Sequence, residues 1–127
     1  MKKLLVTMTL IFSTGTLSSP SNEKWQWVTQ NETGTNYYLY VDGISKVDGY
    51  VYFWTLSDYP KSISGVFSIK RYIQVDCKFL RFARLSLSFH KEQMGGGIGK
   101  IDNNPSDWYQ ASVNSPNGTI LEAVCNR

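Results

Sequence analysis

Large apolar residues alternate with polar residues along much of the chain, and this period of two is typical of β-strands with one buried face. Polar stretches interrupt the alternation. Asp48-Gly49 is the strongest turn signal among them, because this pair suits a two-residue hairpin. The pattern predicts six strands: Trp25 to Thr29, Tyr37 to Val41, Ile44 to Val47, Tyr50 to Leu56, Phe67 to Cys77 and Arg84 to His90.

The last two strands predict a long hairpin that turns near Lys78 to Leu80. One face of its first strand carries Phe67, Ile69, Ile73, Val75 and Cys77, and the other carries Ser68, Lys70, Tyr72, Gln74 and Asp76. In its second strand, Leu85, Leu87 and Phe89 alternate with Arg84, Ser86, Ser88 and His90. Arg71 interrupts the apolar face of the first strand. It must reach solvent or find an acidic partner, because an unpaired buried charge is costly.

The pattern changes after the hairpin. Residues 94–107 are rich in Gly, Asn and Pro and predict a loop. Ser115-Pro116 is a helix start, and Ile120, Leu121, Val124 and Cys125 then fall on one helical stripe. A helix of about ten residues is marginal alone, so we expect it to pack on the sheet.

The N-terminus has the features of a secretory signal peptide. A basic start, Met1-Lys2-Lys3, precedes a mostly apolar run from Leu4 to Phe12 that is too short to span a bilayer as a helix, and small residues follow it. We expect residues 1–19 to be removed and residues 20–127 to form a single domain in the periplasm or at the cell surface. No later segment is apolar enough to predict a transmembrane helix.

Export bears on the two cysteines, Cys77 and Cys125, because an oxidising compartment permits disulfides. A redox-active or metal-binding pair needs closer spacing or further ligands, so a structural bridge is the better interpretation. The expected fold is α+β: an antiparallel β-sheet meander of about five to six strands, with a short C-terminal helix packed on one face and held by this disulfide.

Charge and motifs exclude several classes of function. The formal net charge is only +3, and Lys2 and Lys3 supply two of the 13 basic residues, so nucleic acid is not the expected partner. His90 is the only histidine; it is interpreted as a solvent-facing strand residue, and no nucleophile elbow accompanies it. The Gly95-Gly96-Gly97 segment does not match a phosphate loop. We predict no enzyme, no catalytic residues, no metal site and no cofactor.

A series of segments, in order, resembles the surface-adhesin protein E family of Gram-negative bacteria. These are Asn36 to Asp42, Ile44-Ser45, the strand ending Trp54-Thr55-Leu56, Ser68 to Tyr72 leading to Cys77, the strand through Phe89, the Gly-rich stretch after Met94, and Ile120 to Cys125. The resemblance implies a curved antiparallel sheet with the helix bridged to its concave side. It also implies binding of host matrix or serum proteins such as vitronectin or laminin at the cell surface, often as a homodimer.

Two groups of residues are candidates for ligand binding. A basic stripe on the long hairpin could meet acidic proteins or polymers, although a solvated cross-strand ladder with Asp76 and Glu92 is the better interpretation. It consists of Lys70, Lys78, Arg81, Arg84 and Lys91. Aromatic residues could form a sugar-stacking platform, although core and dimer contacts are the simpler role. They are Trp25, Trp27, Tyr37, Tyr38, Tyr40, Tyr50, Tyr52 and Tyr59.

Three hypotheses follow from the sequence. The first is an exported, non-enzymatic adhesin-like binding protein. The second is a periplasmic structural or envelope-associated module with no host ligand. The third, more remote, is a carbohydrate-binding or hydrolytic protein.

Overall fold

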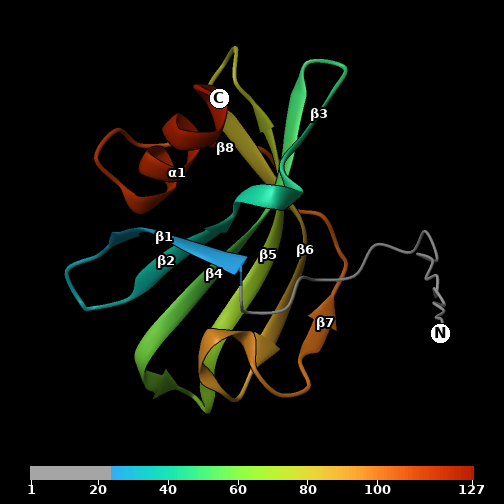
Figure 1. Cartoon of the computed structure of the whole chain (residues 1–127). Coiled ribbons are helices and arrows are strands. Elements are labelled where there is room, and N and C mark those ends of the chain that lie inside the picture. The colour runs from blue at the N-terminus through green and yellow to red at the C-terminus, as the bar shows by residue number, and fades with distance from the viewer. Residues whose placement is uncertain (1–23) are drawn as a thin grey trace, which may run out of the picture.

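The computed structural model describes residues 24–127, so the expected signal peptide lies outside the described residues. The strands form one antiparallel sheet in the order β1-β2-β4-β5-β6-β7, with β3 added to β4 and β8 added to β6 (Figure 1). The elements are β1 (Trp25–Gln30), β2 (Asn36–Tyr40), β3 (Ser45–Val47), β4 (Tyr50–Ile63), β5 (Val66–Asp76), β6 (Arg81–His90), β7 (Lys100–Asp102), β8 (Tyr109–Gln110) and α1 (Pro116–Cys125), with short 3-10 turns η2 (Val41–Gly43) and η3 (Gln93–Gly95).

The predicted fold class is confirmed. All six expected strands are present, and β4 is central, between β2 and β5. The short strands β7 and β8, which lie on the free edge of β6, were not predicted. A segment of two or three residues is too short to show the alternation that identifies a strand in the sequence. These two strands form because the free edge of β6 is available for pairing.

Two-residue turns close two of the hairpins. Asp48 and Gly49 both have positive φ angles, 52° and 86°, as the Asp-Gly signal predicts. Ser64 and Gly65 repeat this geometry between β4 and β5, with φ angles of 52° and 82°. The second turn extends β4 well beyond its predicted end, so the β4–β5 hairpin is longer than the sequence pattern indicated.

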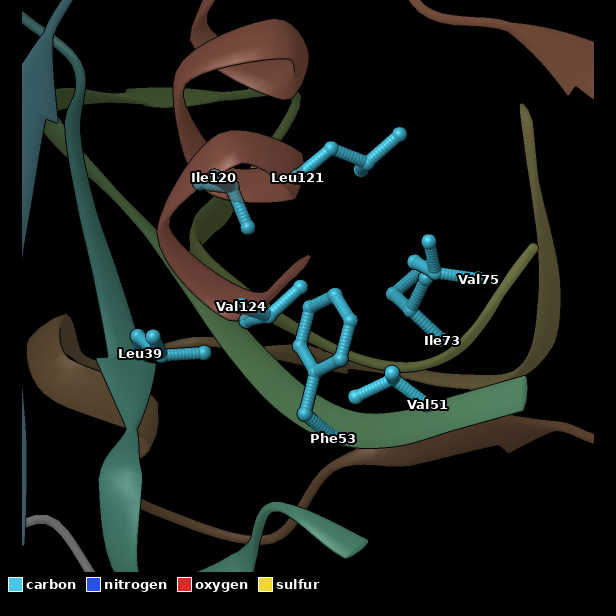
Figure 2. Packing of buried hydrophobic residues seen from close by; sticks show 8 residues of the cluster. All are labelled: Leu39, Val51, Phe53, Ile73, Val75, Ile120, Leu121 and Val124. Atoms are coloured by element: carbon cyan, nitrogen blue, oxygen red, sulfur yellow. The ribbon is translucent and has the colours of Figure 1, made fainter. Parts of the chain in front are cut away.

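Helix α1 packs on one face of the sheet, which we call the helix face. The Ser115 side chain accepts a hydrogen bond from the Gly118 N–H, which satisfies one of the free donors of the first turn. Figure 2 shows helix side chains pointing into a cluster of strand residues. The buried cluster comprises Leu39, Val51, Phe53, Ile73, Val75, Ile120, Leu121 and Val124.

The predicted disulfide is confirmed. Cys77 follows β5 and Cys125 is the last residue of α1; their Cα atoms are 5.7 Å apart and their sulfurs 2.05 Å apart. The bond joins residues 48 positions apart in the sequence. It therefore ties the end of the helix to the same strand that supplies Ile73 and Val75 to the core.

A β-bulge in β6 reverses the face to which the side chains on the Arg84 side of the bulge point. The register shifts between Tyr72 and Ile73 of β5, so that Ile73 pairs with Arg84 while Tyr72 pairs with Ser86. Directly paired residues share a face, so Arg84 lies on the helix face with Ile73. The expectation that Arg84 shares a polar face with Ser86 is therefore wrong, because strict alternation fails where one strand carries an extra residue.

Candidate functional site

The five basic residues proposed from the sequence do not form one stripe. Lys78 and Arg81 lie at the turn between β5 and β6, and Lys91 is exposed just beyond the other end of β6. Arg84 lies on the helix face. Lys70 is only 5% exposed, so the expectation of a solvent-facing lysine there is wrong.

Residues 92–99, the covering loop, explain why Lys70 is buried. This loop includes η3 and lies over the end of the sheet farthest from α1, on the outer face opposite the helix (Figure 1). The Ser68 hydroxyl donates to the Glu92 carbonyl at 2.6 Å and accepts from the Gly95 N–H at 2.8 Å. The Asp58 carboxylate accepts from the Met94 N–H at 2.6 Å. Polar side chains of the sheet thus hold the loop in place.

Burial under the covering loop changes the pKa of three side chains, those of Asp58, Lys70 and His90. It raises the pKa of Asp58, and the Met94 N–H partly opposes this. It lowers the pKa of Lys70. Burial also lowers the pKa of His90, helped by the nearby Lys70 charge and opposed by the backbone of Gly97 and Gly96.

His90 is 5% exposed, so the interpretation of a solvent-facing histidine is wrong. Its Nε2 lies 2.7 Å from the Ser88 hydroxyl, and a side chain at Gly99 would collide with the ring. The glycine-rich stretch therefore serves to let backbone approach the sheet closely. The sequence predicted only that this segment is a loop, because composition does not show which surface a loop covers.

Of the two alternatives that the sequence left open for Arg71, solvent or an acidic partner, the structure favours solvent, since the ion pairs among the described residues do not include Arg71. Its Nη1 donates to the Ser57 hydroxyl at 2.8 Å, across from β5 to β4. Arg71 is only half-buried, which moderates the cost of placing its charge on the helix face.

The turn between β5 and β6, together with β8 beside it, forms a surface that we call the hairpin tip. It consists of Lys78, Phe79, Leu80, Arg81, Trp108 and Tyr109. The Asp76 carboxylate accepts from the N–H groups of Lys78 and Phe79 and from Arg81 Nε at 3.2 Å. Gln110 donates to the carbonyls of Phe79 and Leu80. These bonds hold Leu80 at a positive φ of 53°, so the turn is ordered before any partner arrives.

Apolar and cationic groups meet at the hairpin tip. Phe79 is 58% exposed, and Leu80 and Tyr109 are about half exposed. The Arg81 guanidinium lies 4.6 Å from the Trp108 ring centre and 5.6 Å from that of Phe79, and the Lys78 ammonium is 5.6 Å from Phe79. Such cation–π contacts keep the long basic side chains over the rings. The tip therefore offers aromatic area and positive charge in a fixed arrangement.

Most of the candidate aromatic residues lie on the outer face. Strand pairing places Trp25 opposite Tyr40 and Trp27 opposite Tyr38 there, and Tyr52 stacks on Tyr72. Tyr37 and Tyr59 belong instead to the helix face, where burial, followed by the nearby Tyr59, raises the pKa of Tyr37 against the opposing effects of Arg71 and Asn31. Trp25 contacts Tyr40, and Tyr50 stacks on Trp108, which is not one of the eight candidates. Trp27 is the most exposed of the eight. The platform is thus divided between the two faces.

Residues 24–127 contain no group of three or more His, Cys, Asp or Glu side chains placed to hold a metal ion. None of the helices in this range has the length and apolar character needed to cross a bilayer.

The chain belongs to the surface-adhesin protein E family, because the family model with that description matches residues 25–126. This is a family of adhesins and not of enzymes, and membership implies an exported surface protein with host partners. A search of curated proteins found no match.

Solved structures show the same fold. The structure of Haemophilus influenzae protein E is similar with a TM-score of 0.66 at 14% identity, over 87% of this chain and 91% of that chain. A second crystal form of that protein gives 0.65 at 15% identity, over 87% and 94%. Protein E from non-typeable Haemophilus influenzae gives 0.60 at 15% identity, over 87% and 82%. At such identities the likeness concerns the fold, and no ligand-contact residue can be transferred.

Proposed function

We propose that this protein is exported to the bacterial surface and binds a host extracellular protein, of the matrix or serum type represented by laminin and vitronectin, through the hairpin tip. Family membership supports adhesion as the general role. The observation that carries the location is the exposed apolar and cationic surface at the tip.

The composition of the tip supports protein recognition. Aromatic residues and arginine are enriched in the parts of interfaces that contribute most to affinity, whereas most of an interface contributes little. Phe79 and Trp108 supply the aromatic area, and Arg81 lies over both rings. Because Asp76 and Gln110 already order the turn, binding costs little conformational entropy.

Charge at the tip favours an acidic partner. Lys78 is exposed and Arg81 is half-buried, and the Asp76 side chain that pairs with Arg81 is only 10% exposed. The positive groups of Lys78 and Arg81 are therefore more accessible to a partner than the Asp76 carboxylate. Complementary charge of this kind speeds association and orients the encounter.

The proposal is tested with a matched pair of double variants. The tip variant is Lys78→Glu with Phe79→Ala. The control is Lys100→Glu with Ile98→Ala, which changes the same kinds of exposed residue in the loop and β7 at the opposite end of the sheet. Binding of immobilised vitronectin and laminin is measured by surface plasmon resonance, and surface exposure by antibody labelling of intact cells.

The tip variant should bind at least about tenfold more weakly, and the control should bind like the wild type. Equal binding by both variants would remove the tip from the proposal. Purely periplasmic recovery of a wild type that binds neither protein would overturn adhesion, and would support a structural role in the envelope.

A further inference from the structure

A cleft of about 180 Å³ lies between α1 and the helix face of the sheet, on the side of β5 and β6. Its apolar wall is formed by Phe53, Ile73 and Leu121, which also belong to the core or its edge. Arg71 and Arg84 enter it from the two strands. The cleft is separate from the hairpin tip proposed above, although Tyr109 borders both.

The two arginines share one face of the sheet at diagonal positions on β5 and β6. Arg71 pairs with Leu87, and Ile73 pairs with Arg84, so the bulge in β6 brings Arg84 onto the face that Arg71 already occupies. Without the bulge, Arg84 would point to the outer face. The bulge thus places two positive charges at one cleft, and bulges commonly redirect side chains in this way at functional positions.

Neither arginine has a carboxylate partner within the described part of the chain. The ion pairs found there join Lys24 to Asp42 and Arg81 to Asp76, and no acidic residue lines the cleft. Arg71 donates to Ser57, which is neutral. The Arg84 Nε is buried and makes no hydrogen bond, and its Nη2 reaches the Asn104 carbonyl only at 3.5 Å.

This arrangement is costly in the absence of an anion. A buried donor without a partner, such as the Arg84 Nε, loses the hydration that it has in the unfolded chain. An anion bound in the cleft that both arginines line would supply an acceptor and offset this cost. Guanidinium groups suit carboxylates in particular, because their paired N–H groups match the two carboxylate oxygens.

We propose that this cleft binds a small organic carboxylate, with the anionic group held by Arg71 and Arg84 and a compact apolar part against Phe53, Ile73 and Leu121. Size supports a ligand of this class. A cavity of about 150 Å³ accommodates benzene, so this cleft accommodates a molecule about as large as benzoate. Ser57 and Asn117 add neutral hydrogen-bonding groups at its border.

The test uses benzoate as the probe and the oxidised protein without its signal peptide. Binding is measured by isothermal titration calorimetry and mapped by NMR chemical-shift changes. Benzamide serves as the neutral analogue of the same shape, and sodium sulfate as an anion without an apolar part. The variants are Arg71→Gln and Arg84→Gln, with Lys100→Gln as the control because this exposed cation lies outside both the cleft and the hairpin tip.

Benzoate should bind saturably, in the micromolar to millimolar range, and should shift the resonances of Phe53, Ile73 and Leu121. Each cleft variant should weaken binding by about tenfold or more, as expected for a lost charged hydrogen bond, and Lys100→Gln should leave it unchanged. Equal binding of benzamide, equal binding of sulfate, or equal weakening by Lys100→Gln would each overturn the proposal. If a cleft variant fails to fold, the three probes and the NMR map on the wild type still decide the question.

The outcome is independent of adhesion. Loss of benzoate binding in Arg84→Gln with vitronectin or laminin binding intact would support the cleft alone. The tip variant Lys78→Glu with Phe79→Ala should retain benzoate binding, and a loss of benzoate binding in this folded variant would argue against a separate site.

Discussion

Removing the disulfide is the most direct test of what holds the helix to the sheet. The change is Cys77→Ala with Cys125→Ala, which leaves no thiol in the chain. The bond constrains the unfolded chain by closing a loop between residues 48 positions apart. For a loop of this length, the chain-entropy relation gives about 4 kcal/mol at 25 °C. This amount is a large part of the free energy of unfolding of a small domain, which is roughly 5–15 kcal/mol.

The effect should be largest locally at α1. A ten-residue helix is marginal alone, and the buried contacts of Ile120, Leu121 and Val124 must then hold it without the covalent tie. Amide hydrogen exchange in α1 should accelerate more than exchange in β4 and β5. The sheet should remain folded under conditions that favour the native state.

The measurement is urea denaturation followed by tryptophan fluorescence, with the reduced wild type as the control. The double variant and the reduced protein should both lose about 4 kcal/mol relative to the oxidised protein. A loss below about 1 kcal/mol in the variant would refute the loop-closure reasoning. A large loss with unchanged exchange in α1 would refute the assignment of the bond as the tie that holds the helix.

Three further predictions concern the core, a histidine and the helix start. Phe53→Ala should cost about 3–5 kcal/mol in urea denaturation, because Phe53 is 0% exposed, whereas Ile98→Ala at a 96% exposed position should have almost no effect; equal effects would contradict the assigned core. His90→Gln should flatten the pH dependence of stability between about pH 5.5 and 7.5. The pKa of His90 lies below its ordinary 6.5 in the folded state, so the unfolded chain binds the proton more tightly and the wild type loses stability as pH falls through this window; an unchanged slope would contradict this. Ser115→Ala should cost about 1 kcal/mol by removing the acceptor for the Gly118 N–H, and an unchanged melting temperature would show that this cap contributes little.

Local patterns in the sequence were sufficient for six of the eight strands, the first turn and the helix. Alternation located the long strands because each buries one face, and Asp48-Gly49 located a turn because this pair tolerates the positive φ angles that the hairpin requires. Ser115-Pro116 located the start of α1 for a similar reason, since capping depends on neighbouring residues only. The pairing of Cys77 with Cys125 followed from their number and the expected compartment.

The candidate sites were harder to predict, because they depend on contacts between distant segments. Lys70 and His90 occupy alternating positions that indicate solvent, yet residues 92–99 fold over them. Arg84 follows the alternation of its strand until the bulge reverses its face. No local signal in the sequence marks either event.

The sequence by itself thus determined the class of fold and the disulfide pairing, because these depend on periodicity and on the number of cysteines, and its resemblance to a known family indicated the adhesin family. Only the tertiary structure decided which charged side chains are accessible. A single extra residue in β6 moved Arg84 beside Arg71, and a loop that approaches the sheet through glycines buried Lys70. Face and burial depend on register and on packing between segments, which the order of residues along one strand does not specify.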